Sequence, residues 1–356
     1  MSNDNPSFWK KQPVGVEEGA NDLIKYPNKI PTESYKLPEG FMFENIHDTK
    51  ELSKFLYENY VEDYENEYRL IYSETFFDWV LNTPKHKEEY SLGLRFNNYL
   101  VGYIFGRETE IMIHNKTKRV ACINFLCVTK DLRNKRITPI LIREITRRFN
   151  CNGIFQAVFT AGTDLLFEVC VSRYWHMPIN SKKLLSIGYL DTPCDIEIKS
   201  CRSSTRSMTK DDLPVVFNLY KDFIMKYKIC DNMDMEDFKY AMFNKITKVF
   251  VHEEDGKIVC FGSYFLLDTL AIKKNIKITG AYLSISCGKD LKNMLEDLVY
   301  MAFKDKCDVM NALDIGESGE YLNKLGFLEG SGELKYYLYN WKSGKIDKKD
   351  VFFYMQ

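Results

Sequence analysis

Three cations gather at one turn of the chain, in a context suited to binding an anion. Arg133, Lys135 and Arg136 follow an apolar segment with the character of a buried strand and precede an amphipathic segment that opens with Thr138 and Pro139. Threonine can cap a helix and proline suits its first turn, so we expect a helix to begin here. The free N–H groups and positive end of that helix would add to the side-chain charges. The chemistry predicted is phosphate binding, and the alternative is a basic turn that is only solvated.

The composition of the whole chain makes any such site a local feature. The 49 lysines and arginines against 50 acidic residues give a formal net charge of −1, without the broad positive field of a nucleic-acid-binding protein. A content of 45% hydrophobic and 28% charged residues in 356 is typical of one or two globular domains. No apolar run reaches the ~18 residues that cross a bilayer. We therefore expect a cytoplasmic protein with no membrane span and no nucleic-acid partner.

Cysteine and histidine usage argues against disulfides and metal sites. The ten cysteines are scattered, form no C-x-x-C pair and follow no secretory signal, so we expect reduced thiols. The five histidines form no H-x-x-x-H pair, and none lies near two cysteines. We expect no metal.

The predicted elements recur in the same order along the chain. Helices at 52–64 and 76–81 precede a hairpin at 90–114 that turns at Asn97-Asn98, a strand at 118–128 and the helix after the basic turn. Helices at 213–229 and 237–243, a hairpin at 248–267 that turns at Asp255-Gly256, a strand at 276–287 and a helix at 291–306 repeat this order. The repeat predicts two halves of related α+β architecture, each with a mostly antiparallel sheet, joined near residues 195–208.

Longer motifs connect the basic turn to known families. The spacing Arg133-x-x-Arg136-x-Thr138 is similar to the pyrophosphate loop with which the acetyltransferase superfamily known as GNAT binds coenzyme A. The central block "INFLCV" to "TRR", with "GIFQAV" and "RYWH", closely resembles glycylpeptide N-myristoyltransferase. So do "FWKKQPV", "LPEGF", "ENYVEDYENEYR", "NALD" and "GSGELKYYLYNW", which extend the likeness over almost the whole chain.

The resemblance implies a fold and a division of labour. It implies an α+β fold of two GNAT-like halves with a pseudo-twofold relation, in which mixed, mostly antiparallel sheets flanked by helices form one compact unit. Residues 1–40 would be an arm that covers coenzyme A, and residues 41–200 the half that binds acyl-CoA. Residues 201–356 would contribute most of the peptide groove and the terminal carboxylate. The chain is expected to be a monomer.

The reaction that the resemblance implies is direct transfer of a myristoyl group from myristoyl-CoA to the N-terminal glycine amine of a peptide or protein. Myristoyl-CoA is a co-substrate, and no cofactor is expected. The backbone amides of Phe125 and Leu126 would form the oxyanion hole, while Thr160 and the carbonyl of Asn124 would steady the amine. The α-carboxylate of Gln356 would be the base. Independently, the apolar end "DVFFYMQ" suggests a chain terminus that is packed inside.

The resemblance also implies two sets of binding residues. Those for acyl-CoA are Ser7, Phe8, Trp9, Phe125, Leu126, Cys127, Val128, Arg133, Asn134, Lys135, Arg136, Ile137 and Thr138. Those for the peptide are Tyr60, Asp63, Tyr68, Tyr72, Gly162, Tyr174, His176 and Asp314. By residue type alone, Cys127 and Val128 would be ordinary core residues, the aromatic arm a loose tail, and His176 a hydrogen-bonded structural group.

Some positions depart from the pattern of the family. Asn134 and Thr138 replace its usual serine and alanine, and Met177-Pro178 replaces its usual Arg-Ser. Two other functions stay open at this point. One is a GNAT-type N-acyltransferase that uses acetyl-CoA, and the other is an inactive homologue that binds acyl-CoA or N-terminal peptides.

Overall fold

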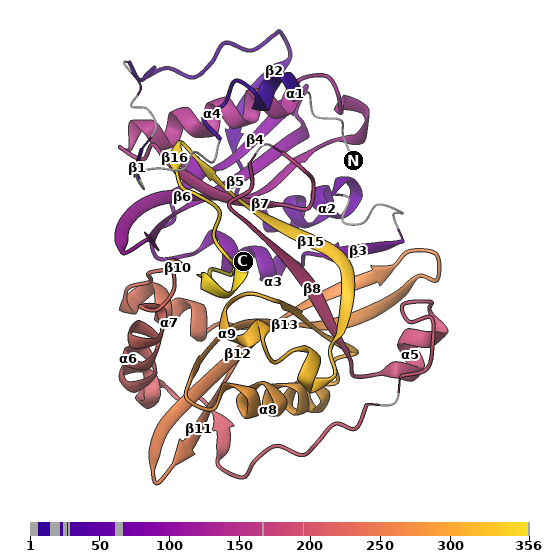
Figure 1. Cartoon of the computed structure of the whole chain (residues 1–356). Helices are drawn as coiled ribbons and strands as arrows, with labels where there is room; N and C mark the ends of the chain where they lie inside the picture. Colours follow the sequence, from indigo (N-terminus) through magenta and orange to yellow (C-terminus); the bar gives the residue numbers. More distant parts are fainter. Residues whose placement is uncertain are drawn as a thin grey trace.

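A computed structural model of the chain describes residues 6–14, 22–23, 27, 29–60, 67–165, 167–194 and 196–354. Both predicted hairpins are present (Figure 1). Strands β4 (Ser91–Phe96) and β5 (Tyr99–Ile113) are joined by Asn97 and Asn98, whose φ angles of 47° and 69° are those of a type I′ turn. Strands β11 (Thr247–Glu254) and β12 (Lys257–Ala271) are joined in the same way by Asp255-Gly256.

The predicted repeat is confirmed in the order of the elements. The first half contains α2 (Thr49–Asn59), β3 (Tyr68–Ile71), α3 (Glu74–Leu81), β4, β5, β6 (Lys116–Val128), α4 (Ile137–Cys151) and β7 (Ala157–Ala161). The second half contains α6 (Leu213–Ile224), β10 (Ile229–Asp231), α7 (Met235–Met242), β11, β12, β13 (Ile276–Gly288), α8 (Leu291–Lys304) and β14 (Val309–Leu313). Helix is therefore followed by strand, helix, hairpin, strand, helix and strand in each half.

The two halves exchange strands. The end of β5 pairs with β10 of the second half, and the end of β12 pairs with β3 of the first half. The prediction of one helix over 213–229 was wrong, because the pairing with β5 requires an extended backbone at Ile229. Helix α6 ends at Ile224, and Ile229 instead pairs with Ile113 in the sheet.

Among the described residues, 15 strands form one mixed sheet, and β1 and β16 form a separate pair. Strand β15 (Leu328–Tyr339) lies between β7 and β8 (Cys170–Pro178), and β8 pairs in turn with β14, so the sheet is continuous from one half to the other. The remaining elements are α1 (Pro6–Trp9), β1 (Asp22–Leu23), β2 (Phe41–Asn45), α5 (Ser181–Ser186), β9 (Thr205–Ser207), α9 (Gly316–Gly319), β16 (Trp341–Lys342) and β17 (Val351–Phe352). The expected α+β fold of one compact unit is confirmed.

The largest apolar cluster joins both halves to the end of the chain. It includes Ile111 of β5, Tyr220 of α6 and the segment 351–354, all buried. Burial of large apolar side chains is the main source of folding free energy, so this segment is held firmly. Among the described residues, none of the helices is both long and apolar enough to cross a membrane.

Candidate active site

A cavity opens where two parallel strands separate. Strands β6 and β7 are paired only from Ala121 and Ala157 to Ile123 and Phe159, after which β6 follows β5 and β7 follows β15. A cavity of about 660 Å³ is lined by residues from both strands beyond that point. This volume is within the usual range for a ligand site. Eleven of the predicted site residues line it, namely Trp9, Tyr60, Asn124, Phe125, Leu126, Cys127, Val128, Arg133, Thr138, Thr160 and Gly162.

An irregularity in β6 shapes the wall of this cavity. Asn124 is paired with Phe105 and Cys127 with Tyr103, so two residues of β6 stand opposite one of β5. Phe125 lies in this bulge with a φ of 54°, which is costly for a residue with a large side chain. Its ring is buried against Tyr72, Phe76 and Phe77, with centroid distances of 5.3, 6.1 and 5.6 Å. The aromatic packing thus holds a strained backbone in place beside the cavity.

Many of the residues that line the cavity are apolar. Cys127 and Val128 are both buried and both line it, so they belong to the core and to the cavity at once. The other apolar lining residues there include Ile104, Ile123, Ile142, Ile145, Phe149 and Ile154. Asn59, Arg133, Thr160 and Asp164 add polar groups to the lining. The cavity can therefore hold a ligand with both an apolar and a polar part.

The basic turn begins helix α4, although not at the residue that was predicted. Arg136 is the N-cap residue, with a left-handed φ of 62°, and the helix runs from Ile137. Thr138 is therefore not the cap, and Pro139 occupies the third helical position, where its missing N–H is still tolerated because the first-turn amides have no helical partner. Lys135 and Arg136 are exposed, and the structure gives neither an ion pair within the described part of the chain.

Two further residues of the turn have different surroundings. Arg133 lines the cavity and donates a hydrogen bond to the carbonyl of Asn59, at the end of α2. Asn134 is exposed, with a left-handed φ of 64°. The turn thus brings one cation into the cavity and leaves two cations at the positive end of the helix.

The N-terminal arm packs beside the same cavity. Trp9 of α1 is 9% exposed, lines the cavity and stacks on Phe159 of β7 with a centroid distance of 5.9 Å. Phe8 contacts Trp9 edge to face at 5.3 Å. The backbone N–H of Asn340 donates to the carbonyl of Pro13 at 2.7 Å, which fixes the arm to the end of β15. The predicted arm is thus part of the cavity wall at Trp9.

The end of the described chain is connected to the face of the sheet that carries Thr160. Thr160 of β7 is directly opposite Tyr336 of β15, so their side chains are on the same face of the sheet. The Tyr336 hydroxyl, fully buried, donates to the carbonyl of Phe353 at 2.9 Å. One side chain therefore connects the strand pair at the cavity to a residue three positions before Gln356. Gln356 itself lies outside the described residues.

The predicted peptide residues fall into three groups. Tyr60 and Tyr72 are neighbours, with a centroid distance of 6.1 Å, and Tyr72 contacts Phe125. Gly162, at the end of β7, lines the cavity between β6 and β7. These three lie near the strand bulge. Asp63 lies outside the described residues, as does the side chain of Ser7.

The second group surrounds His176. Its Nδ1 is 2.7 Å from Oδ1 of Asn311 and 3.1 Å from the hydroxyl of Tyr189, which contacts Tyr68 edge to face at 5.4 Å. Burial lowers the pKa of the His176 imidazole, against the effect of the hydrogen bond that Nδ1 donates to Asn311 Oδ1, so the ring is neutral near pH 7. His176 is thus fixed by hydrogen bonds, as expected of a structural or binding group.

The third group is held by the C-terminal segment. Asp314, which follows β14, accepts hydrogen bonds from the backbone N–H of Arg173 at 2.7 Å and from Lys348 Nζ at 2.5 Å. Tyr174 packs against the large central cluster, next to these residues in sequence. Asp314 is thus a buried, charge-paired carboxylate whose hydrogen-bonding capacity is largely used.

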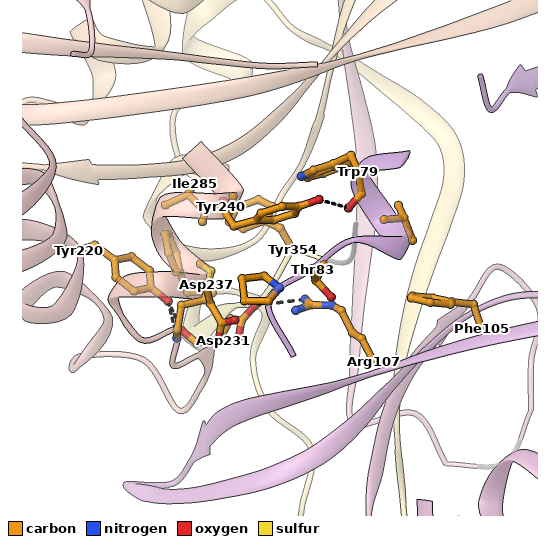
Figure 2. A pocket seen from close by; sticks show the side chains of 15 residues that line it. Trp79, Thr83, Phe105, Arg107, Tyr220, Asp231, Asp237, Tyr240, Ile285 and Tyr354 are labelled. Carbon is orange, nitrogen blue, oxygen red and sulfur yellow. Dashed lines mark hydrogen bonds and ion pairs between the residues drawn. The ribbon is translucent and has the colours of Figure 1, made fainter. Parts of the chain in front are cut away.

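A second cavity, of about 40 Å³, lies between the halves and was missed by sequence reasoning (Figure 2). Arg107 of β5 and Asp231 of β10 line it, with Nη2 and Oδ2 3.5 Å apart. Thr109 also donates to Asp231, at 3.0 Å. Burial raises the pKa of Asp231, and Arg107 opposes that shift. Tyr354, the last described residue, lines the same cavity. No local pattern marks this pair, because the two strands meet only in the folded chain.

The splayed strands, the bulge and the basic helix start are arranged in a GNAT-like α+β fold. A GCN5-related N-acetyltransferase from Anabaena variabilis has the same general fold, with a TM-score of 0.51 at 10% identity over 84% of this chain and 72% of that one.

The family is narrower than this fold class. The N-terminal domain model of "Myristoyl-CoA:protein N-myristoyltransferase" matches residues 22–172, and its C-terminal domain model matches residues 175–351. Glycylpeptide N-tetradecanoyltransferase 2 of Bos taurus is 33% identical over 97% of this chain and 75% of its own length. The crystal structure of Saccharomyces cerevisiae N-myristoyltransferase with bound myristoyl-CoA has a TM-score of 0.92 at 27% identity and covers 100% of both chains. This chain belongs to the Myristoyl-CoA:protein N-myristoyltransferase family, and it is an acyltransferase.

Proposed function

We propose that this enzyme transfers a myristoyl group from myristoyl-CoA directly to the N-terminal glycine amine of peptides and proteins. The observation that carries the proposal is the bulge at Phe125 and Leu126 in the wall of a cavity with many apolar lining residues. The amine nitrogen forms a bond to the thioester carbon, the C–S bond breaks, and coenzyme A leaves as the thiol after taking up a proton. The chain itself is not acylated.

The bulge would supply the oxyanion hole. Residues of a bulge are released from regular strand pairing, so the N–H groups of Phe125 and Leu126 are available to the oxygen of the tetrahedral intermediate. Removing one such donor in a well-studied protease costs about 2.7–4 kcal/mol of transition-state stabilisation. The packing around Phe125 stabilises a strained φ, and orienting these two N–H donors would be the function of that strain.

The terminal carboxylate would be the base. In water an α-carboxyl group has a pKa of about 3.5 and an α-amine of about 7.8, so proton transfer between them is unfavourable. Removal of water raises the pKa of the carboxyl group and lowers the pKa of the amine, so proton transfer from the amine to the carboxylate becomes less unfavourable. The buried segment 351–354 and the hydrogen bond from Tyr336 to Phe353 direct the chain end toward the face that carries Thr160. Thr160 and the carbonyl of Asn124 would then orient the amine.

The acyl-CoA would occupy the cavity, with its CoA part near the basic turn and its acyl chain against the apolar lining residues. Arg133, Lys135 and Arg136, with the first amides of α4, would bind the pyrophosphate. Phe8 and Trp9 would cover the CoA, and Cys127 and Val128 would contact the acyl chain. Tyr60, Tyr72 and Gly162 near the bulge, together with the groups around His176 and Asp314, would bind the peptide.

Mass spectrometry of the acylated product tests this function. The enzyme is incubated with a peptide that begins with glycine and with acetyl-, myristoyl- or palmitoyl-CoA in turn. We expect an adduct on the N-terminal amine that forms fastest from myristoyl-CoA, and none on the same peptide with an N-terminal alanine. Faster transfer from acetyl-CoA would contradict the proposal, as would acyl-CoA binding without turnover on a panel of peptides that begin with glycine.

A further inference from the structure

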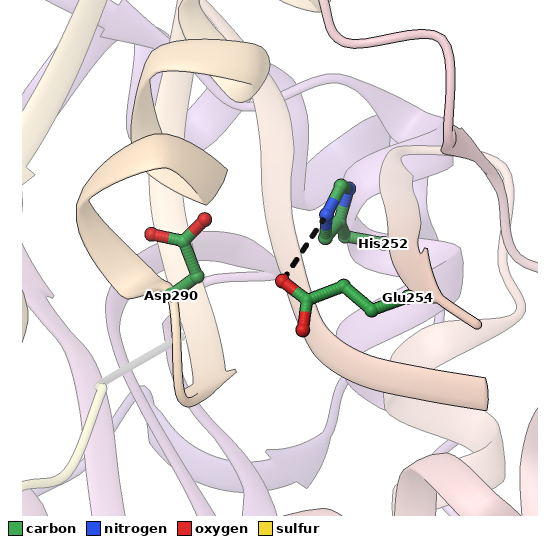
Figure 3. A group of neighbouring side chains, drawn as sticks. All are labelled: His252, Glu254 and Asp290. Atoms are coloured by element: carbon green, nitrogen blue, oxygen red, sulfur yellow. Dashed lines mark ion pairs between the residues drawn. The ribbon is translucent and has the colours of Figure 1, made fainter.

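A histidine and two carboxylates meet in the second half, on the far side of this half from the strand pair described above. His252 and Glu254 lie on β11, and Asp290 is the residue before α8 (Figure 3). One ligand atom from each side chain lies within 4.8 Å of those from the other two. The three residue types are those that bind divalent transition metals.

Hydrogen bonds fix which nitrogen of His252 carries the proton. The hydroxyl of Thr205 donates to Oδ2 of Asp297 at 2.6 Å, and the same oxygen accepts from Nε of Arg202 at 2.8 Å. Since the single hydroxyl proton is used on the carboxylate, Thr205 Oγ1 can only accept from His252 Nδ1, which is 2.9 Å away, and the Ser204 hydroxyl lies farther from the same nitrogen, at 3.3 Å. The neutral imidazole therefore has its lone pair on Nε2.

That lone pair has no donor facing it. The imidazole is 4% exposed, and within the described part of the chain Nε2 approaches Glu254 Oε1 at 3.9 Å without a hydrogen bond. A lone pair and a carboxylate repel each other unless a cation lies between them.

Asp290 also lacks hydrogen bonds that its position in the fold would lead one to expect. An aspartate at the N-cap of a helix usually accepts hydrogen bonds from the first backbone amides, but the Asp290 side chain makes none. It accepts instead from Arg202 Nη1 at 2.5 Å and Asn293 Nδ2 at 2.9 Å, and both contacts use Oδ2. The other oxygen is thus left for a further partner.

We propose that His252 Nε2, Glu254 and Asp290 bind one divalent transition-metal ion of the zinc type. Glu254, Asp290 and Asp297 against Arg202 leave a net charge of −2 around a neutral imidazole, which a divalent ion balances. Tetrahedral zinc with bonds of about 2.0–2.2 Å needs ligand atoms roughly 3.3 Å apart, so the three groups must approach slightly. Glu254 is 56% exposed and can make that movement. Water completes the coordination, and the imidazole ligand favours zinc or cobalt over magnesium or calcium.

The ion would tie β11 to the start of α8, so its predicted effect is on the stability of the fold and not on acyl transfer. Thr205 and Asp297 would act as positioning residues that orient the imidazole, as hydrogen-bonded partners of metal-bound histidines commonly do. This site is independent of the proposed function.

Cobalt(II) titration followed by visible absorption tests the site, with zinc added afterwards as a competitor. We expect one cobalt per chain with the absorption of a four-coordinate O/N site, no thiolate band, displacement by zinc, and a higher midpoint of thermal unfolding with zinc. Glu254→Gln and His252→Asn should abolish the signal, and Thr205→Val should weaken cobalt binding about 10–100-fold. Glu253→Gln, whose side chain pairs with Arg206 instead, should leave it unchanged.

Several results would overturn the site. These are the absence of one-to-one binding, a thiolate band showing that cysteines hold the metal, or binding that survives Glu254→Gln. Glu254 is exposed, so its variant keeps the test valid even if His252→Asn does not fold.

Discussion

The Tyr336 hydroxyl offers a direct way to test whether the position of the chain end matters for catalysis. Tyr336→Phe removes the 2.9 Å hydrogen bond to Phe353 and changes no other heavy atom. Both groups are fully buried, so the Phe353 carbonyl is left without this partner, at a cost of about 1–3 kcal/mol. The chain end can relieve that cost only by moving away from the face that carries Thr160.

The magnitude of the rate effect follows from this energy. The displaced terminal carboxylate would stabilise the transition state less well. If the activation free energy of acyl transfer rises by about 1.4 kcal/mol as a result, the reaction slows about tenfold. The affinity for acyl-CoA should not change, because neither Tyr336 nor Phe353 lines the cavity. Single-turnover transfer from enzyme loaded with myristoyl-CoA measures the rate without product release.

Tyr264→Phe is a matched control for this experiment. Tyr264 is also fully buried and donates to Asp305 at 2.7 Å, but it lies in the core of the second half. It should lose less stability than Tyr336→Phe, because water can hydrate the exposed Asp305 carboxylate, and it should keep the parental rate. If Tyr336→Phe transfers the acyl group within twofold of the parent, or if both variants slow equally, the reasoning about the chain end is refuted.

Three further predictions concern the proposed ligand sites and pH. Arg136→Glu should raise the KM for myristoyl-CoA at least tenfold, about 1.4 kcal/mol, because it opposes the pyrophosphate, whereas Lys257→Glu on a distant hairpin should not; equal KM values in steady-state assays would remove the phosphate role from the turn. Trp9→Ala should also raise this KM and leave the peptide KM near the parental value, and the reverse pattern would place the arm at the peptide. Burial lowers the pKa of His176 in the folded protein below the value of about 6.5 that a histidine has in the unfolded chain. The contribution of the neutral ring to the free energy of unfolding is therefore complete above about pH 6.5, and it is lost as the pH falls toward the folded-state pKa. Urea unfolding at pH 7.5 and 5.5 should show a smaller pH dependence for His176→Asn than for the parent, and an equal dependence would exclude His176 as a source.

Local sequence patterns predicted the features that depend on neighbours in the chain. Asn97-Asn98 and Asp255-Gly256 marked both hairpins because few residues adopt left-handed turn conformations easily. The cations before α4 marked the helix start, although Arg136, not Thr138, is the cap. Propensity places a helix start only to within a residue or two, because several neighbouring residues can satisfy the first amides.

Features that depend on distant contacts were not predictable in the same way. Ile229 continues the apolar pattern of the predicted helix, and only the pairing of residues 229–231 with the end of β5 makes them a strand. The insertion of β15 between β7 and β8, and the burial of Arg107 with Asp231, likewise need the folded sheet. The bulge at Phe125 has no turn residue to signal it, since a phenylalanine held there by aromatic packing looks like any core residue.

The most direct test of the proposed mechanism compares three proteins that differ only at the chain end. Deleting Met355 and Gln356 withdraws the carboxylate by up to about 7 Å, beyond the ~3 Å reach of proton transfer. Appending two glycines puts an amide in its place, and Gln356→Ala leaves the carboxylate where it was. After each protein is shown to be folded and to bind myristoyl-CoA, single-turnover acyl transfer is measured. The account predicts a loss of at least about a hundredfold for the first two and a rate within about fivefold of the parent for the third. A glycine-extended enzyme that transfers the acyl group as fast as the parent would show that the terminal carboxylate is not the base.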